Sequence, residues 1–163
     1  MRRMVDASEL HGEFVLSSGA TSSVSFDKFR YLPRPELLRD VAHAVTELLA
    51  PDTALLGAPE GAAMLLVAAV SLETGLPVTV VRKQPKEYGT RAQVEGEVTG
   101  GAVTTLLEDV STTGHQVQRA ADVLAGAGAD VRRIVLAIDR GGAYVLREAG
   151  YDVRAVAVLR PAD

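Results

Sequence analysis

Residues 104–117, TTLLEDVSTTGHQV, place two acids and three hydroxyl side chains within a few positions of one another. Glu108 and Asp109 follow an apolar, β-prone run, and the residues 111–114, STTG, come directly before a helical pattern. Burying a charge is costly, so two adjacent carboxylates at the end of a buried strand indicate a binding function. The alternative is that Asp109 forms a turn while Ser111 and Thr112 only cap the next helix.

The two halves of this turn suit different parts of one ligand. The start of a helix offers free N–H groups and the positive end of its dipole, and hydroxyls and a glycine add donors and close approach, so residues 111–114 suit a phosphate monoester. Carboxylates accept hydrogen bonds from vicinal hydroxyls and can hold Mg²⁺ directly or through water. The turn therefore predicts a ribose phosphate site, with Glu108 and Asp109 on the sugar.

Alternating strand and helix patterns position this turn. Apolar spacing predicts two short strands within residues 12–32, helices over 35–50, 62–74, 114–125 and 143–149, and strands over 53–57, 78–82, 102–107, 131–138 and 153–159. The helix over 62–74 is apolar nearly all round and is expected to be covered on both sides. Such alternation predicts an α/β fold, a parallel Rossmann-like sheet flanked by helices, with ligands beyond the carboxyl ends of its strands. The segments GAPEG, RKQPKEYGT and EDVSTTG follow three of those ends.

Composition excludes several classes. The chain has 163 residues, which suits a single domain, and its formal charge of −4 gives no reason to expect nucleic-acid binding. It has no cysteine and three scattered histidines, which excludes thiolate sites and gives no sign of a zinc site. No stretch resembles a signal peptide or is long enough to span a bilayer, so we expect a cytoplasmic protein with no membrane partner.

The turn TTLLEDVSTTG resembles the phosphoribosyl pyrophosphate (PRPP) signature of type I phosphoribosyltransferases, in which two acids precede a Thr/Gly turn. Two further segments are similar to orotate phosphoribosyltransferases in particular. VVRKQPKEYGT, residues 80–90, resembles that family's catalytic loop, and AIDRGG, residues 137–142, resembles its Asp-Arg motif. Residues 12–32 resemble its N-terminal substrate hairpin. The resemblance covers most of the chain in the family's order.

The resemblance implies a type I phosphoribosyltransferase fold with a small N-terminal β hood. It implies one domain over 1–163, divided into a hood over 1–33 and a helix plus α/β core over 34–163, with a mobile catalytic loop over 83–101. The implied reaction moves the phosphoribosyl group from PRPP to orotate, giving orotidine 5'-phosphate and pyrophosphate. A homodimer is also implied, in which the lid lysine reaches the neighbouring active site.

Site residues carry over position by position. The resemblance implies that the catalytic residues are Lys83, Lys86 and Asp109, and it implies the following binding residues. The PRPP-binding residues are Arg82, Lys83, Lys86, Tyr88, Glu108, Asp109, Val110, Ser111, Thr112, Thr113, Gly114, His115 and Gln116. The orotate-binding residues are Thr112, Arg140, Ser25 and Phe26. Mg²⁺ is the expected cofactor, held mainly by PRPP with no direct protein ligand, and reached through water from Glu108 or Asp109.

The charges of the predicted lid residues and of Arg140 suit the anionic substrates that the resemblance implies. Lysine and arginine on a closing lid stabilise the charge that grows on departing pyrophosphate. The Arg140 guanidinium can grip the orotate carboxylate through two parallel hydrogen bonds. The alternatives are a solvated basic loop and an ordinary surface arginine.

Four positions depart from the family pattern, namely Tyr88, Ser17, Ser25 and Glu60. Tyr88 replaces a common histidine, and Glu60 adds a negative charge to the GAPEG loop, where we expect it to face solvent rather than assist Mg²⁺. These departures keep two other hypotheses open. One is a phosphoribosyltransferase for another base, and the other is a non-catalytic regulator that senses PRPP.

Overall fold

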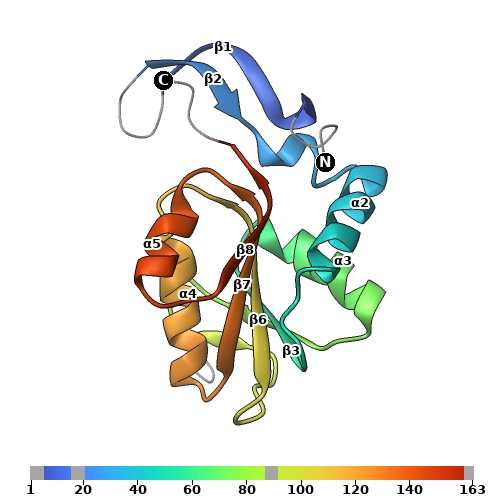
Figure 1. Ribbon diagram of the computed structural model, residues 1–163, viewed down its shortest axis with the longest axis vertical. Helices are drawn as coiled ribbons and strands as arrows, with labels where there is room; N and C mark the ends of the chain where they lie inside the picture. Colours follow the sequence, from blue (N-terminus) through green and yellow to red (C-terminus); the bar gives the residue numbers. More distant parts are fainter. Residues whose placement is uncertain (1–5, 16–20, 87–91, 160–163) are drawn as a thin grey trace.

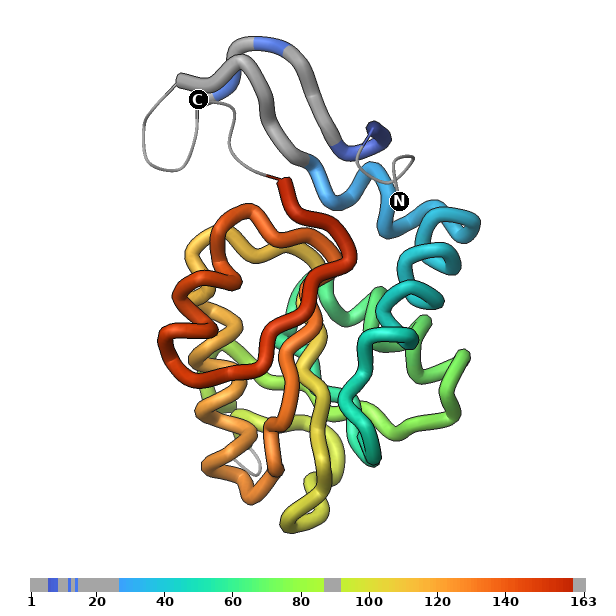
Figure 2. Tube along the Cα trace, viewed as in Figure 1, coloured from blue at the N-terminus to red at the C-terminus, as the bar shows by residue number. Residues whose placement is uncertain are grey.

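The computed structural model describes residues 6–15, 21–86 and 92–159, and for most of the residues at 9–15 and 21–26 it describes the backbone alone. Strands β1 (Glu9–Val15) and β2 (Thr21–Phe26) form an antiparallel two-stranded sheet. Figure 1 shows this hairpin above the main sheet, and Figure 2 shows the end of the described chain, beyond β8, rising toward it. The 3-10 turn η1 (Lys28–Arg30) connects the hairpin to the main body.

The main sheet has six strands in the order β5-β4-β3-β6-β7-β8. These are β3 (Leu55–Pro59), β4 (Val78–Val81), β5 (Val94–Glu95), β6 (Val103–Ser111), β7 (Asp130–Asp139) and β8 (Val153–Val158). All neighbouring pairs are parallel except β4 and β5. The predicted α/β class is confirmed, and the antiparallel edge strand β5 is an addition, since its segment shows no periodic pattern.

Helices cover both faces of this sheet. The helices α2 (Pro35–Thr46) and α3 (Ala63–Thr74) lie on one side, and α4 (His115–Gly126) and α5 (Gly142–Glu148) lie on the other (Figure 1). Two apolar clusters fill these layers, and neighbouring residues of β6 divide between them. Leu107 packs with the α2 and α3 side, while Leu106 packs with the α4 and α5 side. The alternation expected of a strand buried on both faces is therefore present.

Strand β6 is longer than predicted. It was expected to end at Leu107, before the two acids, but its parallel ladder with β7 continues to the pair Ser111 and Asp139. Glu108 and Asp109 therefore lie inside a buried strand, and the turn itself is restricted to residues 112–114. The expectation that acids and hydroxyls share one turn is wrong in this respect.

The helix α3 also differs from expectation. Leu66, Val67 and Val70 are buried against the sheet, but Met64, Leu65 and Leu72 are 45%, 43% and 89% exposed. The residues that the structure describes cover only one side of this apolar helix. Among the described residues, no helix has the length and apolar character to cross a bilayer.

Candidate active site

Between β3 and β6, the helical connections leave the centre of the sheet toward opposite edges. From β3 the chain passes through α3 to β4 on one side, and from β6 it passes through α4 to β7 on the other. Strands β3 and β6 pair only from Leu55 and Thr104 to Gly57 and Leu106. Beyond that pair, the rest of GAPEG (residues 58–61) and the segment EDVSTTG (residues 108–114) do not pair with each other. Ligands of such sheets bind at this kind of switch point, so the sheet topology alone brings the two predicted segments to one site.

The turn after β6 requires glycine at two positions. Gly114 precedes α4 with φ 77°, and a Cβ atom there would lie 2.7 Å from the carbonyl oxygen of Gly142. A Cβ atom on Gly142 would in turn lie 2.0 Å from Oγ of Ser111. The starts of α4 and α5 therefore meet so closely that neither glycine tolerates a side chain. Thr112 and Thr113 are exposed on this turn, whereas the Ser111 hydroxyl is buried beneath it.

The predicted Asp-Arg motif lies beside this turn. Oδ1 of Asp139 accepts hydrogen bonds from the backbone N–H groups of Gly141 and Ala143, so this acid caps α5. The backbone N–H of Arg140 donates to the carbonyl oxygen of Ser111 at 2.8 Å. The backbone of Arg140 is thus fixed next to the turn 112–114, at the carboxyl end of the neighbouring strand.

The acid pair of β6 is almost completely buried. Glu108 and Asp109 are 5% and 1% exposed, and the backbone N–H of Asp109 donates to Oε1 of Glu108 at 3.1 Å. Burial, followed by the neighbouring Asp109, raises the pKa of Glu108 to about 9, and Lys28 opposes this shift. Burial beside Asp109 thus favours the protonated form of the Glu108 carboxyl group.

Lys28 is a site residue that the sequence analysis missed. Its Nζ lies 3.0 Å from Oδ2 of Asp109. The side chain of Asp27 accepts from the N–H of Phe29, and Tyr31 is fully buried, so the turn that carries Lys28 is held firmly. The Tyr31 hydroxyl points to the carbonyl oxygen of Asp109 at 3.5 Å, and burial raises the pKa of this phenol. The motif FDKFRYL has no period that would signal this contact.

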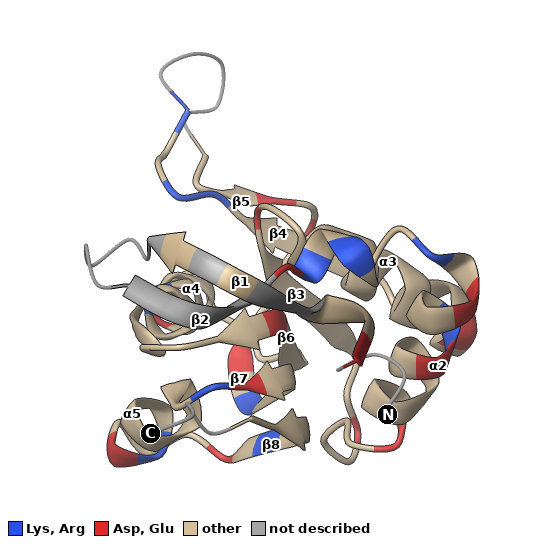
Figure 3. Ribbon diagram, turned by 90° about the horizontal axis from the view of Figure 1, so that it is seen from above, with Lys and Arg blue, Asp and Glu red and all other residues tan. Residues whose placement is uncertain are grey.

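The predicted lid cations lie at the other side of the switch point. Oε1 of Glu60 accepts from the backbone N–H of Lys83 at 2.8 Å in an exposed contact, so this partly exposed acid is linked to the residues that follow β4. Lys86 pairs with Glu95 on β5, Nζ to Oε1, at 2.5 Å. Figure 3 shows the basic stretch that follows β4 at the margin of the molecule beside β5.

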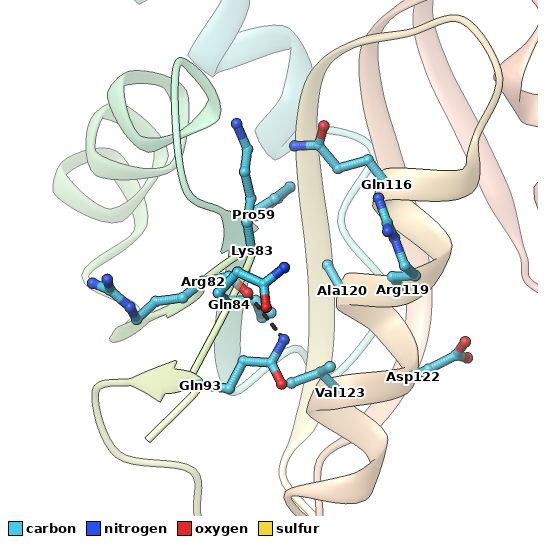
Figure 4. Close-up of a pocket in the computed structure, with 11 residues that line it drawn as sticks. Pro59, Arg82, Lys83, Gln84, Gln93, Gln116, Arg119, Ala120, Asp122 and Val123 are labelled. Atoms are coloured by element: carbon cyan, nitrogen blue, oxygen red, sulfur yellow. Dashed lines mark hydrogen bonds between the residues drawn. The ribbon is translucent and has the colours of Figure 1, made fainter. Parts of the chain in front are cut away.

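A pocket of about 490 Å³ lies between the residues that follow β4 and the helix α4. Figure 4 shows Gln116 and Arg119 of α4 facing Lys83 and Gln84 across it, with the Arg82 guanidinium directed away from α4. Pro59, from the GAPEG loop, completes one wall. Predicted residues Lys83 and Gln116 thus share one hollow with Arg119, which the sequence analysis missed because a single exposed helix arginine carries no signal.

Other predicted residues are placed as follows. Val110 lies in β6 between the acid pair and Ser111, and His115 is exposed at the first position of α4. Ser25 and Phe26 end β2, whose backbone alone is described there, and Tyr88 lies outside the described residues, as does Ser17.

The acid pair was also tested as a metal site. Within the described part of the chain, no group of three or more histidine and acid side chains could hold a metal ion. Oδ1 of Asp109 is buried without a hydrogen-bond partner among these residues, which fits an acceptor for a sugar hydroxyl or a metal-bound water.

Comparison with known proteins decides the family. A scan against protein-family models finds no match. The chain is 39% identical over 156 residues to an orotate phosphoribosyltransferase of Halobacterium salinarum, covering 94% of this chain and 88% of the relative. It is 42% identical over 149 residues to one from a Nocardioides species, covering 90% and 83%. The chain belongs to the orotate phosphoribosyltransferase family.

The family assignment agrees with the coordinates. An orotate phosphoribosyltransferase of Mycobacterium tuberculosis H37Rv superposes with a TM-score of 0.86 at 26% identity, over 97% of this chain and 93% of that one. The predicted type I phosphoribosyltransferase fold is confirmed. The resemblance seen in three separate motifs therefore reflects membership of the family over nearly the whole chain.

Proposed function

We propose that this protein transfers the phosphoribosyl group of PRPP to orotate, forming orotidine 5'-phosphate and pyrophosphate in pyrimidine biosynthesis. One observation carries the proposal beyond family membership. The buried Asp109 carboxylate is paired with Lys28, and it lies with the buried Glu108 beside the turn 112–114, at the switch point of the sheet. The arrangement offers carboxyl oxygens to a diol, with the charge of Asp109 balanced by a lysine and the pKa of Glu108 raised by burial.

Residues on β6 and α4 hold the ribose phosphate. The turn 112–114 and the first N–H groups of α4 bind the 5-phosphate, and Gly114 allows the backbone to approach it. Glu108 and Asp109 bind the sugar hydroxyls, and Arg140 binds the orotate carboxylate from the next strand. Fixing both reactants in this way replaces a bimolecular encounter with an oriented one.

Lid residues act on the leaving group. The bond between the anomeric carbon and the pyrophosphate oxygen breaks as a ring nitrogen of orotate attacks, and negative charge grows on the pyrophosphate. Lys83 and Lys86, on the segment 83–101, stabilise that charge. Mg²⁺, carried mainly by PRPP, would add further neutralisation when bound.

Formation of a homodimer would cover the exposed apolar side of α3. Met64, Leu65 and Leu72 expose apolar side chains there, and an apolar helix face of this kind is suited to contact with a second copy. A dimer would bring the lid lysines near a neighbouring site. We assign the protein to the cytoplasm, where PRPP and orotate would be available.

The decisive test is loss of orotate absorbance after addition of PRPP and Mg²⁺, with Lys86→Ala as the lid variant. Wild type should consume orotate, and Lys86→Ala should turn over at least about tenfold more slowly. Turnover of a purine or of uracil in place of orotate would establish a different base. PRPP binding without turnover of any base would show a PRPP sensor.

A further inference from the structure

The backbone of Glu95 is fixed at the base of the lid. Strand β5 pairs antiparallel with β4, with Glu95 opposite Val80. The hydroxyl of Thr79 donates to the carbonyl oxygen of Glu95 at 2.9 Å. Gly96 follows with φ 95°, and a Cβ atom there would lie 2.8 Å from the carbonyl oxygen of Val78. These contacts fix the backbone from which the Glu95 side chain extends, at the point where the segment after β4 rejoins the sheet.

One carboxylate oxygen of Glu95 is shared by two lid cations. Oε1 lies 2.5 Å from Nζ of Lys86 and 3.8 Å from Nη1 of Arg82. Among the described residues, Lys83 takes part in no ion pair, and only its backbone N–H is held, by Glu60. In this state two of the three proposed pyrophosphate-binding cations are occupied by an acid of the protein itself.

We propose that Glu95 competes with pyrophosphate for Lys86 and Arg82 and releases them when the substrate arrives. The inference rests on the proposed function, in which Lys86 acts on the leaving group, and on the predicted role of Arg82 in PRPP binding. A diphosphate carries more charge than one carboxylate and is therefore the stronger partner. The Glu95 side chain is 37% exposed, so the pair is partly screened and the competition is modest.

The test is the affinity of the protein for pyrophosphate and for PRPP, measured by calorimetry with Mg²⁺ present and orotate absent. Glu95→Gln keeps the shape of the side chain and removes its charge. We expect both ligands to bind about two- to fivefold more tightly. The KM for PRPP should fall in the same proportion while kcat changes little, because only the competing acid is lost.

Glu97→Gln is the matched control, since Glu97 is an exposed acid two residues away and its loss changes the net charge equally. It should leave both affinities unchanged. Glu95→Gln introduced into Lys86→Ala should have a smaller effect than in wild type, because one of its two cations is gone. Should Glu95→Gln fail to fold, Glu95→Asp, whose shorter side chain reaches Lys86 less well, should show a smaller tightening.

Two results would overturn the inference. Unchanged affinity in Glu95→Gln would show that the pair does not compete, and weaker affinity would show that Glu95 instead orients Lys86 toward the ligand. Failure of the proposed function looks different, since wild type would then leave orotate unconsumed in the absorbance assay, whatever its affinity for PRPP.

Discussion

The ammonium of Lys28 lies 3.0 Å from Oδ2 of Asp109, joining the segment that follows the N-terminal hairpin to the acid pair of the central strand. Asp109 is 1% exposed, so this contact supplies a counter-charge that water cannot. Together with the raised pKa of Glu108, it lowers the negative charge at this end of β6, where the sugar phosphate is proposed to bind.

Lys28→Met should weaken PRPP binding by about tenfold and lower the melting temperature, because it leaves the Asp109 carboxylate buried without a partner. Calorimetry and thermal unfolding would measure the two effects. Lys28→Arg should keep most of the affinity. Arg30→Met, on the same turn and equally charged, should be neutral in both measurements.

The variant Lys28→Met/Asp109→Asn separates binding from stability. Removing the charge of Asp109 should restore the melting temperature lost in Lys28→Met, but it should not restore PRPP affinity. Recovery of affinity in the double variant would show that the pair serves the fold alone.

Glu108→Gln should make stability less dependent on pH. The pKa of Glu108 is about 9 in the folded protein and 4.5 as its ordinary value, so the folded state keeps a proton that the unfolded state releases. The stabilisation from this proton is full below pH 4.5 and is lost as pH rises toward 9. Melting temperatures between pH 5 and pH 8.5 should therefore fall more in wild type than in Glu108→Gln, with Glu148→Gln as an exposed control. If the melting temperature falls equally with pH in wild type and in Glu108→Gln, then Glu108 is ionised in the folded protein.

Gly142→Ala should disturb the phosphate turn. The added Cβ atom would lie 2.0 Å from the Ser111 hydroxyl oxygen, and the strand end must move to make room. We expect weaker binding of PRPP and a loss of about 1–3 kcal/mol in the free energy of unfolding. Gly126→Ala meets nothing within 4 Å and should cost neither stability nor affinity.

Arg133 is predicted to serve stability alone. Its Nε donates to Oδ2 of Asp152 at 2.7 Å, and Nη1 donates to the carbonyl oxygens of Leu48 and Leu49 at 3.1 and 3.0 Å. Arg133→Met should cost about 2–3 kcal/mol by chemical denaturation and leave the KM for PRPP unchanged. Arg154→Met removes a more exposed partner of Asp152 and should cost less than about 1 kcal/mol.

The sequence predicted the order of elements well, because apolar periodicity reports directly on faces that are buried. It predicted the helix 62–74 closely, against Ala63–Thr74 observed. It placed the end of the helix beginning at Pro35 at residue 50, whereas the structure ends it at Thr46. The carbonyl groups of Leu48 and Leu49 bind Arg133 from β7, and no local pattern reveals that contact.

Only those parts of the candidate site that form local sequence motifs could be predicted. The motif around Asp109 and the basic run from Arg82 are local and carry their chemistry in adjacent residues. Lys28, Glu95 and Arg119 reach the site only through the fold, so nothing near them in the chain marks them. The extension of β6 was missed because acids usually end a strand, whereas here pairing with β7 continues past them.

The split of the sheet after Gly57 and Leu106 has a mechanical consequence. Sugar, 5-phosphate and base would be supported by β6 and β7, while the departing diphosphate would be supported by β3, β4 and the segment between β4 and β5. Pyrophosphate and the nucleotide would thus be bound by two separate groups of strands. Pyrophosphate could then dissociate without disturbing the residues that bind the nucleotide.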